Sequence, residues 1–179
     1  MALPSTLYRF RIALSDVDRN VYEDLDLRVS MHPSETPPYL LTRVLAYALS
    51  YEPGLEFAAG GLSDSDTPAI SLAGTRGGLA LWIDIGNPTA RKLHKAAKAA
   101  ARVKVFTYKD PAHLVREIRE NKVHRADELE IYSFEGPFLE ALAESLGRDN
   151  RWELLHTAGS LNVTVAGRSI AGESHRHSV

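Results

Sequence analysis

The stretch of the chain between residues 79 and 108 constrains the fold more than any other part. Residues 79–85 and 103–108 are mostly apolar and predict two strands, while residues 88–101 carry apolar side chains at helical spacing. A strand, a helix and a strand within about thirty residues predict a parallel crossover, which is almost always right-handed. We therefore expect a sheet that contains neighbouring parallel strands and a helix packed against one face.

The rest of the chain predicts further strands and helices around this crossover. The other expected elements are a hairpin over 8–14 and 23–29, a helix beginning at Pro37 and Pro38, a short strand over 69–72, a helix from Pro111, a strand over 129–134, a helix over 136–147 and a hairpin over 152–157 and 161–165. These elements predict an α/β (α+β) fold with a mixed central β-sheet flanked by helices. We expect one domain over residues 1–171 and a loose tail over residues 172–179.

Composition limits the classes of function. The chain has 179 residues, 44% of them hydrophobic, which suits one domain with a sizeable core. Its net charge of -2 gives no general attraction for polyanions, so any contact with nucleic acid must be local. The absence of cysteine excludes disulfides, thiol catalysis and thiolate metal sites. With no signal-like or bilayer-spanning apolar segment, we expect a cytoplasmic protein with no membrane partner.

Asp84 and Lys92 form a candidate pair at the corner between the central strand and its helix. Strand side chains alternate, so Asp84 and Trp82 point to one face of the sheet. On the helix, Leu93 and Ala96 belong to the apolar stripe that must cover that sheet, and Lys92 lies at the edge of this stripe. Its methylenes can follow the sheet and return the ammonium toward Asp84. By contrast, Arg91, Lys95, Lys98 and Arg102 are expected to form a solvated stripe on the opposite side of the helix.

Carboxylates near this corner suggest a divalent metal site. Asp84, one of Asp64 or Asp66, and Glu35 could supply the hard oxygen ligands that Mg²⁺ or Mn²⁺ requires. A structural role is the alternative for each loop residue. An acid at a helix N-terminus is stabilised by the helix dipole, and aspartates in a Gly/Ser loop often form turns.

Five blocks of sequence resemble a known family. They are Ser15-Asp16-Val17-Asp18-Arg19, His32-Pro33-Ser34-Glu35-Thr36, Arg43 with Leu45-Ala46-Tyr47, Gly61-Leu62 with Asp66 and Pro68, and Trp82-Ile83-Asp84-Ile85-Gly86-Asn87-Pro88. In this order they resemble the YaeQ family of bacterial proteins, which is similar in fold to the PD-(D/E)XK nuclease superfamily. The resemblance implies an αβββαβ core of restriction-endonuclease-like type, between an N-terminal and a C-terminal β-hairpin. It implies the scaffold of a nuclease, not the activity itself.

Two parts of the superfamily signature are altered. The resemblance makes Glu35 the acid of the first core helix and Asp84 the acid of the (D/E)XK element. The lysine normally lies two residues after that acid, where this chain has Gly86, so Lys92 on the next helix would replace it. Pro68 is followed by Ala69 instead of an aspartate, and Asp66 would have to supply the missing carboxylate.

Two functional hypotheses follow. The first is a Mg²⁺- or Mn²⁺-dependent nuclease acting on DNA or RNA. In it Asp84 and Asp66 would be metal ligands, Glu35 an accessory acid and Lys92 the cation that stabilises transition-state charge. The second is a catalytically degenerate member of the same fold that binds nucleic acid or a protein without cutting. Binding by this second kind of protein would persist in EDTA and weaken with salt.

Overall fold

The computed structural model describes residues 4–59 and 66–179. Within them, ten strands form one sheet in the order β2-β1-β8-β9-β10-β7-β6-β5-β4-β3. The strands are β1 (Thr6–Asp16), β2 (Val21–Met31), β3 (Glu56–Phe57), β4 (Ile70–Ala73), β5 (Leu79–Ile85), β6 (Ala100–Thr107), β7 (Glu130–Phe134), β8 (Asp149–Thr157), β9 (Ser160–Val165) and β10 (Arg168–His177). The α-helices are α1 (Pro37–Leu49), α2 (Ala90–Ala99), α3 (Pro111–Glu120) and α4 (Gly136–Glu144). The expected mixed sheet with flanking helices is confirmed.

The predicted crossover is present as β5, α2 and β6, with β5 and β6 paired in parallel. Gly86 ends β5 with φ +84°, a left-handed conformation that glycine adopts without strain. Thr89 then caps α2, because its side-chain oxygen accepts a hydrogen bond from the Lys92 amide at 3.2 Å. The helix ends at Ala99 and the chain continues directly into β6. Arg102, expected on the helix, therefore lies on the strand.

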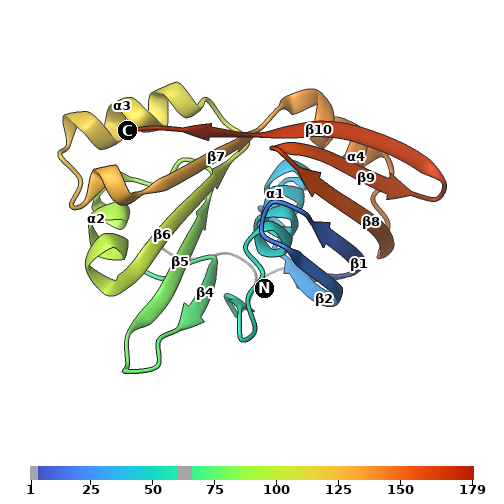
Figure 1. The fold of residues 1–179 in the computed structure, drawn as a ribbon, viewed down its shortest axis with the longest axis horizontal. Coiled ribbons are helices and arrows are strands. Elements are labelled where there is room, and N and C mark those ends of the chain that lie inside the picture. Colours follow the sequence, from blue (N-terminus) through green and yellow to red (C-terminus); the bar gives the residue numbers. More distant parts are fainter. Residues whose placement is uncertain (1–3, 60–65) are drawn as a thin grey trace.

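The sheet curls around α1, α4 packs against α1 and shares its core, and α2 and α3 lie on the other face of the sheet. Figure 1 shows α1 between the two halves of the sheet, while α2 and α3 cover the opposite face of β5, β6 and β7. Ten consecutive residues of α1, from Leu40 to Leu49, are buried. Leu81, Ile83 and Ile85 join the core around α1, whereas Trp82 joins the smaller core under α2 and α3. The two faces of β5 thus belong to two separate cores, as the alternation of its side chains requires.

Both predicted hairpins form, and they lie beside each other. β1 pairs antiparallel with β2, and β8 pairs antiparallel with β9. β8 also pairs in parallel with β1, so that Ile12 lies opposite Trp152. Among the described residues, no helix is long and apolar enough to cross a membrane.

The structure corrects the expectation of a loose tail over residues 172–179, because most of this segment forms a strand. Residues up to His177 belong to β10, which pairs with β9 through Arg168 to Glu173 and with β7 through Ser174 to His177. A β-carbon on Gly172 would collide with the ring of Phe138 on α4, so glycine allows the strand to cross that helix closely. The sequence of this segment is polar and shows no clear apolar alternation that would predict a strand. Backbone pairing with its neighbours holds it in the sheet.

Candidate functional site

The corner between β5 and α2 holds a buried acid and its two side-chain partners. Asp84 Oδ1 lies 2.9 Å from Nζ of Lys92, and Asp84 Oδ2 accepts a hydrogen bond of 2.9 Å from Nε1 of Trp82. Asp84 is 1% exposed, and the Lys92 side chain is 11% exposed. The predicted pairing of Lys92 with Asp84 is confirmed.

Burial dominates the electrostatics of Asp84. Desolvation raises its pKa above the ordinary value for an aspartate. The positive charge and hydrogen bond of Lys92 oppose that rise, as do the Trp82 indole and the backbone amide of Ala69. Both carboxylate oxygens therefore already face a donor supplied by the protein.

Asp66 lies near this corner but is held by a different lysine. Its Oδ1 lies 3.1 Å from Nζ of Lys95, and both side chains are well exposed. Lys95 is one helical turn beyond Lys92, so Asp66 lies beside α2 on the surface and not next to Asp84 in the core. Ala69 contributes its amide to the surroundings of Asp84 and offers no carboxylate. Asp64, the other loop acid considered as a ligand, lies outside the described residues.

Glu35 belongs to the other side of the sheet. Its Oε2 lies 3.2 Å from Nη2 of Arg43 on α1, and both side chains are buried. Arg43 also donates to the carbonyl of Ser30 at 2.7 Å, and its guanidinium lies 5.7 Å from the ring centre of Tyr39. Because α1 packs on the face opposite to α2, Glu35 and Asp84 are held in different layers.

The block that begins at His32 forms a turn ahead of α1. The amide of Glu35 donates to the carbonyl of His32 at 2.9 Å, and Oε1 of Glu35 accepts from the amide of His32 at 3.1 Å. Nδ1 of His32 accepts from the amide of Ser34 at 3.1 Å. These reciprocal bonds fix the Glu35 carboxylate against Arg43, and they account for the block in structural terms.

Each of the three candidate acids that the structure describes thus has a cation: Asp84 with Lys92, Asp66 with Lys95, and Glu35 with Arg43. Over residues 4–59 and 66–179, no three side chains of the His, Cys, Asp or Glu type gather in a way that could hold a metal ion. The donors in the described part of the chain do not by themselves fit a preformed Mg²⁺ or Mn²⁺ site, since such ions need several oxygens that converge. In the described residues, this corner provides a largely buried ion pair between Asp84 and Lys92.

The exposed side of α2 is basic, as expected. Arg91, Lys95 and Lys98 are exposed, while Leu93, Ala96 and Ala97 are buried against the sheet. The helix carries four Lys or Arg residues and no acid. Within the described part of the chain, Arg91 and Lys98 make no ion pair, so two of these charges face solvent uncompensated.

A second polar cluster was not predicted as a structural centre. Asp16 is completely buried, with Oδ2 at 2.7 Å from Nε of Arg19 and Oδ1 at 2.9 Å from Nδ1 of His156. Arg19 donates further to the carbonyls of Ala48 and Tyr51 at the end of α1. The sequence signal was the block Ser15 to Arg19, which looks like an ordinary polar turn until His156 and α1 are placed beside it.

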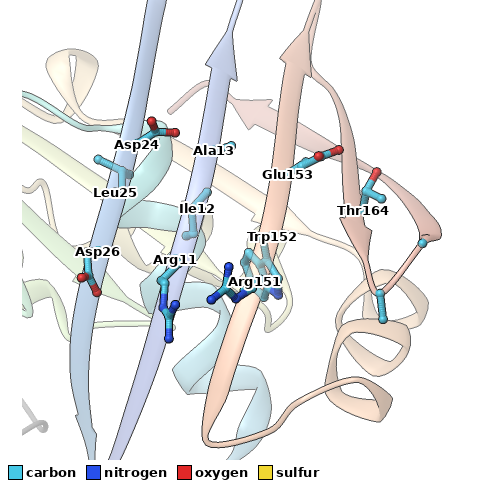
Figure 2. Close-up of a pocket in the computed structure, with 12 residues that line it drawn as sticks. Arg11, Ile12, Ala13, Asp24, Leu25, Asp26, Arg151, Trp152, Glu153 and Thr164 are labelled. Carbon is cyan, nitrogen blue, oxygen red and sulfur yellow. The ribbon is translucent and has the colours of Figure 1, made fainter.

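One surface hollow lies away from all of these residues. Figure 2 shows it on the outer face of β2, β1 and β8, lined by charged side chains of both signs that include Arg11, Asp26 and Arg151. Arg11 is already paired with Asp149 at 2.6 Å. None of the predicted site residues contributes to this hollow.

Over the described residues, the fold and the corner define an α+β protein with one large mixed sheet, four α-helices, and a buried acid and lysine pair between a strand and a helix. The model of the family described as YaeQ protein matches residues 1–173. The chain belongs to the YaeQ family. This part of the expected resemblance is confirmed.

Curated and solved relatives agree with this assignment. The chain is 38% identical over 112 residues to the Uncharacterized protein YaeQ of Escherichia coli K12, a match that covers 63% of this chain and 61% of that protein. The crystal structure of the YaeQ protein from Xanthomonas axonopodis pv. citri has a TM-score of 0.88 at 27% identity and covers 98% of this chain and 99% of that one. The crystal structure of the YaeQ protein from Pseudomonas syringae has a TM-score of 0.89 at 29% identity, covering 99% and 98%.

Proposed function

We propose that this chain is a noncatalytic nucleic-acid-binding protein on a nuclease-like scaffold. The observation that carries the proposal is the enclosed state of Asp84, whose two oxygens face Lys92 and Trp82 while Ala69 occupies the place of a second acid. A metal that cleaves phosphodiesters needs two or more hard oxygens around it. Among the described residues, the corner supplies the acid and the lysine of such a site, and no group of three His, Cys, Asp or Glu side chains accompanies them.

The order of elements supports the scaffold. Along the chain, α1, β3, β4, β5, α2 and β6 follow the αβββαβ order of PD-(D/E)XK nucleases. Asp84 lies on the third strand of that series, and Lys92 lies on the helix that follows it. A lysine that stabilises a buried carboxylate in this way holds the strand to the helix and leaves the outer face of α2 free for binding.

The exposed face of α2 supplies the docking surface. Arg91, Lys95 and Lys98 lie along one side of a helix with no acid, in a chain whose net charge is -2. Phosphate contacts by such side chains displace counterions from nucleic acid, which gives affinity without sequence preference. We name Arg91, Lys95 and Lys98 the α2 basic face.

A salt titration tests the proposal. Fluorescence anisotropy with labelled single- and double-stranded DNA and RNA in EDTA should give binding that weakens as salt rises. In Arg91→Gln/Lys98→Gln, the slope of log affinity against log salt on duplex DNA should fall by about 2, because each lost phosphate contact removes about 0.9. The matched control is Arg28→Gln/Arg151→Gln, two exposed arginines on β2 and β8 whose removal should leave the slope unchanged. Equal slopes in the wild type and the α2 variant would refute this docking surface.

A metal-dependent nuclease is the second candidate, because the acid on the strand and the lysine on the following helix lie together as such a site would need, with Asp84 and Lys92 2.9 Å apart. In that case Asp84 and Asp66 would hold Mg²⁺ or Mn²⁺, Glu35 would be an accessory acid and Lys92 would stabilise transition-state charge. The test is cleavage of the same nucleic acids in Mn²⁺ by the wild type and Asp84→Asn. Cleavage that Asp84→Asn abolishes would replace the noncatalytic proposal, and cleavage that the variant leaves intact would reject this assignment of residues.

A further inference from the structure

A cleft opens beside β6 on the face of the sheet opposite to Lys92. It has a volume of about 550 Å³ and lies between the turn that joins β1 to β2, the end of α1 and the inner face of β6. Its lining includes Arg19, Tyr22, Tyr51, Glu52, Arg102 and Lys104. Volumes of this order are typical of sites for small ligands.

Lys104 is the unusual member of this lining. It is opposite Ile83 on β5, so its side chain points to the α1 side of the sheet, and it is only 9% exposed. Throughout the described residues, its ammonium has no hydrogen bond and no carboxylate at ion-pairing distance. A lysine that is mostly buried without a side-chain partner is uncommon in folded proteins.

The nearest acids are already engaged by other donors. Oε2 of Glu52 lies 2.7 Å from Nη2 of Arg102, and Oε1 of Glu130 accepts a hydrogen bond of 2.9 Å from the hydroxyl of Tyr132. Burial lowers the pKa of Lys104, the charges of Glu130 and Glu52 oppose this, and Arg19 and Arg102 add to the lowering. The ammonium therefore has charges of both signs around it, with Glu130 opposite it on β7, and its donors remain available to an incoming anion.

The geometry points to a binding site for a small organic phosphate, with its phosphate on Lys104 and a flat ring against Tyr51 and Tyr22. Arg102 is two residues before Lys104 on β6, so both cations face the cleft. Arg19 contributes charge but few free donors, because its nitrogens already bind Asp16 and the carbonyls of Ala48 and Tyr51. Tyr22 is 57% exposed at the rim of the cleft, so its ring is open to contact with a ligand.

Isothermal titration of the full chain tests this site with three probes: adenosine 5′-monophosphate, adenosine and inorganic phosphate. The monophosphate should bind, adenosine should bind far more weakly because it lacks the anion, and phosphate should bind more weakly because it lacks the ring. Lys104→Met keeps the length and apolar stem and removes the charge. This variant should bind adenosine 5′-monophosphate with an affinity about tenfold or more below that of the wild type, as expected for the loss of a charge-assisted hydrogen bond.

The control is Lys109→Met, which removes an exposed lysine just beyond β6 and outside the cleft. It should leave the affinity unchanged. The free energy of unfolding of Lys104→Met should equal or exceed that of the wild type, because an unpaired buried charge is removed.

Failure of the wild type to bind the monophosphate, or equal affinity in the wild type and Lys104→Met, would overturn the proposal. Marked destabilisation of Lys104→Met would also overturn it, because it would give the lysine a structural role. None of these three results depends on the α2 basic face, which lies on another surface of the molecule.

Discussion

Asp16 and His156 are 140 residues apart in the chain, and Oδ1 of Asp16 lies 2.9 Å from Nδ1 of His156. The contact joins the end of β1 to the end of β8, the parallel neighbour of β1. Arg19 binds the other oxygen of Asp16 and reaches the carbonyls at the end of α1. One buried carboxylate thereby ties three distant segments together.

Asp16→Ala should therefore destabilise the protein strongly. Removal of a buried partner leaves Arg19 and His156 without their carboxylate, and such losses are about 3 kcal/mol. Urea unfolding followed by circular dichroism measures the change. Asp24→Ala, an exposed aspartate on β2, is the control and should be near neutral. Equal effects of the two variants would contradict the role given to Asp16.

Removal of the Lys92 ammonium should lower the free energy of unfolding, because Asp84 would then be buried without its ion pair. Lys92→Met leaves the carboxylate of Asp84 without its ion pair, and the free energy of unfolding should fall by about 3 kcal/mol. In Asp84→Asn/Lys92→Met the buried charge is gone, so the double variant should be clearly more stable than the sum of the two single effects predicts. Lys98→Met, on the exposed side of α2, is the control. Strict additivity of the two single variants would show that Asp84 and Lys92 are not coupled.

The pKa of Asp84 gives stability a defined dependence on pH. Burial raises this pKa, so the folded protein retains the proton at a pH where the unfolded chain has released it. The free energy of unfolding should then decrease as the pH rises from about 4, the ordinary value for aspartate, through the raised value. Asp84→Asn should flatten this part of the curve. A series of urea unfolding curves at different pH values measures both slopes, and a wild-type slope that Asp84→Asn leaves unchanged would contradict the assignment.

Gly172 tests the strand that replaces the expected tail. Gly172→Ala should lower the free energy of unfolding by about 1–3 kcal/mol, because its methyl group would overlap the ring of Phe138. Gly136→Ala is the matched control, since a methyl group there meets nothing within 4 Å. A loose tail would tolerate both changes equally, and thermal unfolding distinguishes the two cases.

The strand and helix around Asp84 were predictable because their signals are local. Alternation along residues 79–85 fixed the face of Asp84, and helical spacing placed Lys92 at the edge of the buried stripe. The layer that holds Glu35 was not predictable in the same way. It depends on how α1 docks inside the curled sheet, and a residue in a loop before a helix carries no periodicity that reports this.

Contacts between distant segments were also out of reach. Nothing in the block around Asp16 indicates that His156 completes it, because a parallel pairing across most of the chain leaves no local pattern. The surroundings of Lys104 were not predictable either. A lysine within an apolar strand does not indicate whether a carboxylate from another segment will pair with it. The sealed state of Asp84 likewise follows from tertiary packing and not from the signature residues.

β10 pairs with β9 through its first half and with β7 through its second half. Among the described strands, the β2-β1-β8-β9 half and the β7-β6-β5-β4-β3 half therefore share no other ladder, and β10 alone makes them one sheet. β10 is the last of the described strands along the chain, so the two halves become one sheet only when it pairs with both β9 and β7. Its backbone amides should report the joining of the halves, and their hydrogen exchange would show whether the molecule opens along this seam before it unfolds as a whole.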